Sequence, residues 1–150
     1  MSTLRNALIV TMATLSVSAA IAAPAQGTGS ICLPIHAEGV GKDLGDGNTT
    51  AKITTHGLLL GTTRASFTIT GVSGTTASFT GPIVFTTPIG KLTAQTVGTF
   101  DVVSGVFRST STSLTGTGVF RRVTGDVTLA GVQNLQTGRF TETVTGRLCI

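Results

Sequence analysis

The sequence predicts an all-β protein, an eight-stranded antiparallel up-and-down β-barrel. Helical periodicity is almost absent after the first 25 or so residues. Thr, Val, Ile, Phe and Gly dominate the rest, and such residues favour strands separated by glycine turns. Turn signals recur roughly every ten to fifteen residues, which is typical of all-β sandwiches and barrels. Closure of the first strand on the last would remove both sheet edges.

Residues 1–25 are predicted to be a secretory signal peptide that is not part of the fold. Arg5 supplies a positive charge, residues 6–17 form a short apolar run diluted by Thr and Ser, and small residues from Ala20 to Ala25 suit a cleavage site. The run is too short and too weakly apolar to span a membrane. Residues 26–150 are then a single β-barrel domain of a secreted protein, extracellular or periplasmic, with no membrane contact after signal removal.

The charge distribution argues against a nucleic-acid partner. Without Arg5, nine Lys and Arg remain against six Asp and Glu, and only Arg121 and Arg122 are adjacent. A nucleic-acid-binding surface would show a basic stripe, usually with stacking aromatic residues. The chain has no Trp and no Tyr, and its seven Phe lie within apolar alternations. The pattern favours a mildly basic, solvated surface.

The first predicted strand is Ile31–Glu38, where apolar and polar residues alternate. Pro34 cannot donate a ladder hydrogen bond, which indicates an edge or a bulge at this position. The segment Gly39–Asn48, rich in Gly, Asp and Lys, is predicted to be a loop. The sequence Asn48-Thr49-Thr50 on that loop is an N-glycosylation sequon, which matters only if the source is eukaryotic.

Seven further strands follow, bounded by turn residues. The second is expected to end at Leu60, with Gly61 making a very tight connection to the third. Their irregular spacing argues against a β-solenoid with a fixed repeat. The predicted ranges are Thr50–Leu60, Thr62–Thr70, Thr75–Thr86, Lys91–Val103, Val106–Leu114, Asp126–Val132 and Arg139–Ile150.

The two cysteines favour closure of the first strand on the last. Cys32 and Cys149 allow one intramolecular disulfide, and the alternatives are two free thiols or an intermolecular bridge. Each cysteine lies on the polar face of its strand, so pairing of the two strands would place both on the same side of the sheet. The bridge would close a long loop, a stabilisation on the order of 4–5 kcal/mol on the chain-entropy model.

A glycine-rich stretch in the C-terminal quarter resembles a known family. Gly116-Thr-Gly-Val-Phe120, then Val123-Thr-Gly125 and Leu129-Ala-Gly131, are similar to the G-T-G-x-F-x-x-[AV]-x-G pattern that precedes the closing strands of the allene oxide cyclase-like and dirigent-like barrels. The resemblance covers residues 114–131 and extends loosely over residues 30–150. It implies an eight-stranded, calycin-like barrel with Phe120 packed into the barrel end.

The resemblance also implies a function. Family members bind small apolar molecules inside the barrel, steer cyclisation or radical coupling of a reactive intermediate, and often form homo-oligomers. The shared stretch is structural, because its glycines permit positive φ in a tight turn. The chain lacks the Tyr and the Asn- and Asp-rich pocket of the plant enzymes, so no catalytic residue is carried over. The side chains expected to contact a ligand are Phe67, Phe79, Phe85, Phe140 and Val144.

Glu142 is the candidate proton-transfer residue. It falls on the same face of the last strand as Phe140 and Val144, so it points inward if that face lines the barrel. Desolvation would raise the pKa of this carboxyl and suit it to general acid or base catalysis. The alternatives are a bulge near Gly138 or Gly146 that turns the carboxyl outward, and a satisfied pair with an arginine.

His36 and Glu38 form a weaker catalytic pair. They lie two residues apart on one face of the first strand, where a His–carboxylate pair could transfer a proton. The same face carries Cys32 and is interpreted as the exterior, so a surface pair is the alternative. With His56 they form the only plausible metal-binding set, and nothing in their spacing requires a metal. No metal and no cofactor are therefore expected.

Three functions fit these observations. The first is a secreted barrel that binds a small apolar metabolite and steers its cyclisation or isomerisation without a redox cofactor, mostly by positioning. The second is a non-enzymatic carrier, lipocalin-like in its logic. The third is a structural or interaction protein of the secreted space with a solid barrel. Frequent Gly, Ala and Thr at alternating positions leave room inside, which favours a cavity.

Overall fold

Nine β-strands and one short 3₁₀ helix build the part of the chain that the structure describes. The structure is a computed structural model that describes residues 29–150, and the predicted signal peptide lies outside that range. Within these residues, no helix has the length and apolar character needed to cross a membrane. The strands are β1 Cys32–Gly45, β2 Asn48–Ile53, β3 Gly61–Ser66, β4 Thr68–Ser73, β5 Thr76–Thr87, β6 Gly90–Asp101, β7 Val106–Gly116, β8 Thr124–Gln133 and β9 Arg139–Cys149, and the 3₁₀ helix η1 is Gly118–Phe120.

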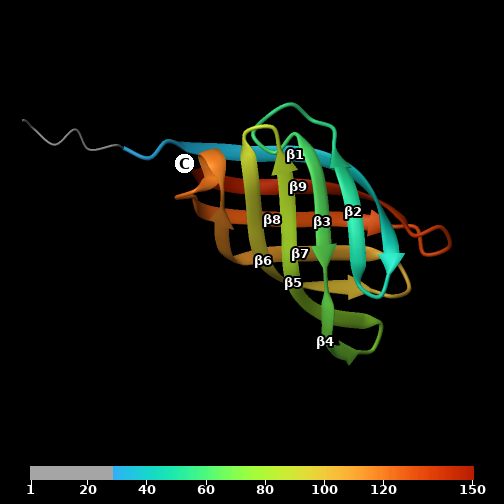
Figure 1. Ribbon diagram of the computed structural model, residues 1–150. Coiled ribbons are helices and arrows are strands. Elements are labelled where there is room, and N and C mark those ends of the chain that lie inside the picture. The colour runs from blue at the N-terminus through green and yellow to red at the C-terminus, as the bar shows by residue number, and fades with distance from the viewer. Residues whose placement is uncertain (1–28) are drawn as a thin grey trace, which may run out of the picture.

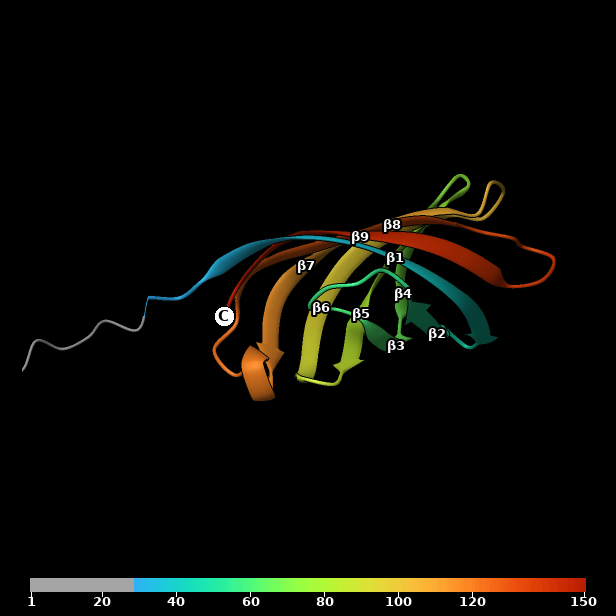
Figure 2. The ribbon, with the colours of Figure 1, turned by 90° about the horizontal axis from the view of Figure 1, so that it is seen from above.

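Eight of these strands close into an antiparallel up-and-down barrel, which confirms the predicted fold class. All except β4 belong to the ring, and each pairs with the ring strands before and after it in the chain. β1 pairs with β9 from Cys32 opposite Cys149 to Lys42 opposite Arg139. Figure 1 shows β1, β9 and β8 running across β3, β5 and β6, and Figure 2 shows the same strands arching over β5 and β6. No sheet edge therefore remains between the first and last strands.

The strand β4 lies outside the ring. The predicted strand Thr62–Thr70 is interrupted at Phe67, so β3 pairs with both β2 and β5 whereas β4 pairs with β5 alone. The interruption falls where β2 begins, with Asn48 opposite Ser66. The N–H of Phe67 donates to the carbonyl of Gly47, at 2.8 Å. Beyond this point β4 continues past the ring next to β5, as Figure 1 shows.

The predicted loop Gly39–Asn48 is wrong, because β1 continues through most of it to a tight turn before β2. Gly39 and Gly41 are needed inside this strand for packing. A Cβ at Gly39 would lie 3.0 Å from Oε1 of Glu142, and one at Gly41 would overlap the ring of Phe140. These glycines mark close side-chain approach within a strand rather than a loop.

The predicted second strand, Thr50–Leu60, is wrong at its C-terminal end. β2 ends at Ile53, and residues 54–60 form a loop that leads to β3. Leu59 in this loop is 2% exposed and belongs to the core. Although residues 54–60 have the apolar composition of a strand, they form a loop that closes one end of the barrel. Burial of Leu59 against the core favours this position, because it removes apolar surface from water.

One half of the barrel, here called the closed half, contains a packed core. Phe120 of η1 and Leu59 of the 54–60 loop close its end, and both are almost completely buried. The burial of Phe120 agrees with its expected place in the barrel end. The core consists of Ile35, Ala37, Ile53, Leu59, Ile83, Phe85, Leu92, Ala94, Phe120, Val123, Val127, Leu129, Val144 and Leu148.

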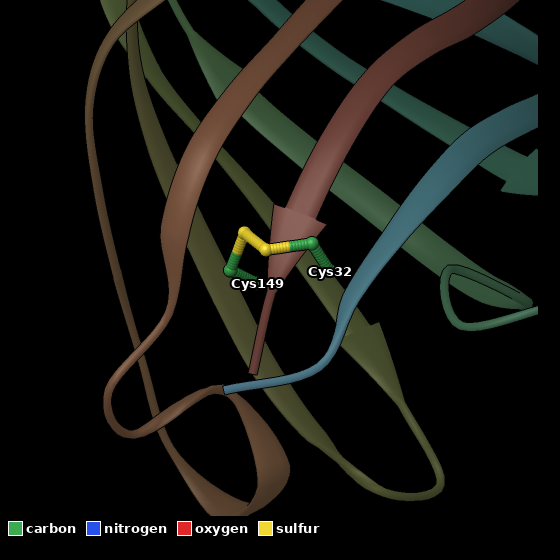
Figure 3. The surroundings of a disulfide bond; sticks show 2 residues. All are labelled: Cys32 and Cys149. Atoms are coloured by element: carbon green, nitrogen blue, oxygen red, sulfur yellow. A yellow bond between two sulfur atoms is a disulfide. The ribbon is translucent and has the colours of Figure 1, made fainter. Parts of the chain in front are cut away.

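The disulfide between Cys32 and Cys149 joins the first and last strands and confirms the predicted pairing. The two residues are directly opposite in the β1–β9 register, at the end of the barrel that holds the core. Figure 3 shows the bridge between the start of β1 and the end of β9. It fixes the closure of the ring covalently, and it fits an oxidising environment.

Candidate functional site

A cavity of about 470 Å³ occupies the other half of the barrel, here called the open half. It lies at the end of the barrel that carries the β1–β2, β6–β7 and β8–β9 turns, and residues of all three connections line it. Its volume lies within the range of roughly 300–1,000 Å³ that is typical of small-molecule sites. The lining residues are Asp43, Gly47, Thr49, Thr63, Ala65, Phe67, Ile69, Phe79, Ile83, Phe100, Val102, Phe107, Ser109, Leu129, Gln133, Leu135, Phe140 and Glu142.

Aromatic rings form much of the cavity wall. The rings of Phe67 and Phe79 lie 4.8 Å apart between centroids, and those of Phe107 and Phe140 pack edge to face at 5.8 Å. Phe100 of β6 also lines the cavity. Such pairs favour offset or edge-to-face contacts because the ring face is negative and the ring edge positive. The wall is therefore apolar and able to attract positive charge.

Three of these rings lie against the barrel wall over glycines of the adjacent strand. A Cβ built at each glycine would overlap atoms of the ring opposite it. The ring therefore fills the space of the absent side chain, in the manner of aromatic rings that cover sheet glycines. The pairs are Phe79 with Gly98, Phe107 with Gly131 and Phe140 with Gly41. Rings held in this way leave the centre of the open half empty.

Glu142 points into the barrel, which is one of the orientations that the sequence leaves open. Gly138 and Gly146 have positive φ of 67° and 149°, yet the pairing of β9 with β1 and β8 runs through without a register shift. The strict alternation of β9 therefore survives, and Glu142 shares the inner face with Phe140 and Val144.

The carboxyl of Glu142 is buried without a partner. The residue is 7% exposed, and its Oε1 has no hydrogen-bond partner. Burial raises the pKa of this carboxyl from its ordinary value of 4.5 to about 7, because an apolar environment disfavours the charged form. Gly39 and Gly131 lie opposite it on the two neighbouring strands, so no Cβ from either strand covers it.

The other carboxyl that lines the cavity, Asp43 at the mouth, is satisfied. Its Oδ1 accepts the N–H of Gly45 at 2.8 Å, and its Oδ2 accepts Nε2–H of Gln133 at 3.1 Å. Asp101, near the mouth but outside the lining, shows the opposite effect to Glu142, since hydrogen bonds from Thr75 and then Ser104 and Val103 lower its pKa. Glu142 is therefore distinguished from both by its lack of donors.

His36 and Glu38 lie outside the barrel. Both are exposed on β1, where they pair with Thr145 and Thr143 of β9. The backbone of Glu38 instead anchors the 54–60 loop, accepting a hydrogen bond from the N–H of Thr54 at 2.9 Å. The structure does not bring this pair to the cavity, so the cavity chemistry rests on Glu142 alone among the candidate catalytic residues.

His56 is exposed in the 54–60 loop. Within residues 29–150, no three His, Cys, Asp or Glu side chains form a group that could hold a metal ion. Asn48, the sequon residue, is exposed at the start of β2, and its Nδ2–H donates to the carbonyls of Gly45 and Asp46 in the adjoining turn. Its side chain remains on the surface.

The expected ligand contacts divide between the two halves of the barrel. Phe67, Phe79 and Phe140 line the cavity. Phe85 and Val144 point inward but are fully enclosed in the core of the closed half, so the structure does not place them in the cavity wall. Strand alternation gives the face of a side chain but not its level along the barrel axis.

Sequence reasoning missed two aromatic residues of the cavity, Phe100 and Phe107. They are paired directly across β6 and β7, on either side of the β6–β7 turn. The sequence contains a signal for the inward direction of Phe107, because Phe107 and Ser109 are two residues apart and therefore share one face of β7. Ser109 is 3% exposed and also lines the cavity. The many Ser and Thr of β7 concealed the inner face, because small polar residues occupy both faces of that strand.

Comparison of the chain with protein-family models, with curated proteins and with solved structures gives no match.

Proposed function

We propose that the protein binds one small apolar molecule in the open half of the barrel and steers its cyclisation or isomerisation without a redox cofactor. The observation that carries this proposal is the buried Glu142 carboxyl, whose Oε1 has no hydrogen-bond partner among the described residues, in a cavity walled by phenylalanine rings. In such a site, catalysis comes mostly from holding the substrate in a reactive shape. Glu142 supplies proton transfer, and its pKa of about 7 lets it donate or accept a proton near neutral pH.

The proposal includes a secreted location. The disulfide fits an oxidising compartment, and residues 1–25 have the sequence features of a secretory signal peptide. A resemblance to the allene oxide cyclase-like and dirigent-like barrels accords with both the cavity and the chemistry, although it rests on the glycine-rich stretch of residues 114–131.

Binding is tested with a neutral apolar fluorophore, N-phenyl-1-naphthylamine. We expect its fluorescence to rise on binding the wild-type protein and to show no such rise with Ala65→Phe, because Ala65 lines the cavity and the added ring fills it. The control is Val97→Phe, which adds the same ring at a position that is 49% exposed outside the barrel. Equal binding by wild type and Ala65→Phe would contradict the proposed site.

The second candidate function is a non-enzymatic carrier that uses the same cavity. Its supporting observation is that, within residues 29–150, Glu142 is the sole candidate proton-transfer residue in the lining, whereas His36 and Glu38 are outside. Glu142→Gln separates the two functions, since it should abolish turnover in the enzyme while the apolar body of the ligand still fits. Unchanged turnover in Glu142→Gln would overturn the catalytic part of the proposal.

A further inference from the structure

The charge of the cavity is opposite to the charge of the chain. The chain has a formal net charge of +4 at pH 7. Yet among residues 29–150 no Lys, Arg or His lines the cavity, and its ionisable groups are Asp43 and Glu142. Asp43 already accepts two hydrogen bonds at the mouth. The unsatisfied charge-bearing group inside the cavity is therefore Glu142.

The surroundings of Glu142 suit a positive charge. Phe107 lies over Gly131, which is directly opposite Glu142, and Phe140 lies two residues away on the same inner face. The rings of Phe107 and Phe140 pack edge to face. The negative face of an aromatic ring attracts a cation, most strongly where water is excluded. A carboxylate beside two such rings can neutralise a cation and surround it with apolar contacts.

We propose that the natural ligand is an apolar molecule that carries one cationic nitrogen, and that this nitrogen binds beside Glu142 while the apolar body lies along the phenylalanine wall. The inference rests on the proposed function in one respect, that the open half is the binding site. It also excludes a class of ligand. The carboxylate of a fatty acid would meet a second carboxyl and no cation in this cavity, and like charges placed together in a dry site repel strongly.

The experiment compares three probes of equal length: n-octylammonium, 1-octanol and octanoate. Isothermal titration calorimetry at pH 8 measures their affinities for the wild-type protein, for Glu142→Gln and for Glu38→Gln. Glu38→Gln is the matched control, because it removes an exposed carboxylate from the outer face of the neighbouring strand β1. Thermal unfolding of each variant verifies that the barrel is intact.

We expect the wild type to prefer n-octylammonium over 1-octanol by about tenfold or more, because the ion pair forms in a desolvated site. This preference should vanish in Glu142→Gln and persist in Glu38→Gln. A preference that survives in Glu142→Gln would overturn the assignment of the cation to that carboxyl.

Failure of the inference and failure of the proposed function give different results. Equal affinity for n-octylammonium and 1-octanol, or tighter binding of octanoate, would overturn the charge inference and leave the cavity as the binding site. No binding of any of the three probes, together with no binding of N-phenyl-1-naphthylamine, would overturn both.

Discussion

The closed and open halves of the barrel are built from the same strands, yet one is filled and the other hollow. In the closed half, Phe85 is fully buried and its cross-strand neighbours are Leu92 and Thr63. In the open half, Phe107 lies opposite Gly131 and occupies the space of the missing side chain. A ring whose cross-strand neighbours carry side chains does not have this space, whereas a ring opposite glycine can lie along the wall.

The second difference between the halves is at their ends. The closed half is sealed by Phe120 of η1 and Leu59 of the 54–60 loop, both within the core. The end of the open half carries short turns, including the Asn134–Gly138 segment, whose backbone closes on itself through the N–H of Gly138 and the carbonyl of Asn134. Glycines opposite the rings, together with an end that no described residue plugs, therefore leave a cavity in a barrel of only eight strands.

The largest expected difference between the halves is in the cost of removing a ring. Phe85→Ala should lower the free energy of unfolding by about 3–5 kcal/mol, because it leaves a void in a packed core. Phe107→Ala should cost roughly 1–2 kcal/mol, because Phe107 is half-buried and borders an existing cavity. Urea unfolding followed by circular dichroism measures both. Equal losses would contradict the division into a filled and a hollow half.

The disulfide should stabilise the whole fold without shaping the open half. Replacing both Cys32 and Cys149 by Ser is expected to lower the free energy of unfolding by about 2–5 kcal/mol, because the unfolded chain gains freedom. The β1–β9 pairing continues as far as Lys42 and Arg139, so the cavity should keep its shape. Urea unfolding gives the loss, and binding of N-phenyl-1-naphthylamine monitors the cavity. Loss of probe binding in the folded double variant would show that the two halves are coupled.

The buried carboxyl at the junction of the halves should make stability depend on pH. The Glu142 carboxyl has an ordinary pKa of 4.5 and a pKa of about 7 in the folded protein. The folded state therefore binds this proton more tightly, and the resulting stability is fully present below about pH 4.5 and is lost as the pH rises through about 7. The total change is on the order of 3 kcal/mol.

Glu142→Gln should remove this pH dependence, because glutamine carries no charge to bury. At pH 8 the variant is expected to be more stable than the wild type by about 2–3 kcal/mol, and at pH 4 the two should be alike. Urea unfolding between pH 4 and pH 8 measures the difference, with Glu38→Gln as the exposed control. A wild type whose stability changes no more than that of Glu142→Gln would show that the carboxyl is solvated.

The smallest expected effect comes from adding a ring where there is already space. Ala65→Phe in the open half should change the free energy of unfolding by less than about 1 kcal/mol, because the cavity accepts the ring. Ala37→Phe in the closed half should cost about 1–3 kcal/mol, since Ala37 is 5% exposed within the core. Thermal unfolding of the pair tests this. A larger loss of stability for Ala65→Phe than for Ala37→Phe would contradict the assignment of the cavity to the open half.

The sequence predicts the wall of the barrel better than its interior. Alternation identifies the inner face of β9, including Glu142, and the placement of Cys32 and Cys149 on polar faces predicts the closure. Both depend on period-two geometry, which is local. Gly39 and Gly41 are different, because only the register shows that they lie opposite Glu142 and Phe140. Without that register their flexibility suggests a loop.

The position of a side chain along the barrel axis also cannot be predicted from the sequence pattern. Phe79 and Phe85 lie on the same inner face of β5, yet Phe79 lines the cavity and Phe85 lies in the core. The difference arises from contacts distant in the chain, namely the plug formed by Leu59 and Phe120 and the glycine opposite Phe79. Such contacts are set by tertiary packing and leave no periodic signal.

The most direct test of the account is the titration of the Glu142 carboxyl itself. Carbon-detected NMR of protein labelled at the glutamate carboxyl carbon follows its protonation from pH 3 to pH 9, and Glu142→Gln identifies the signal. If Glu142 lies unpaired at the junction of a packed half and a hollow half, its titration midpoint will be near 7. A midpoint near the ordinary value of 4.5 would contradict the account, because it would mean that the carboxyl is in water or already has donors.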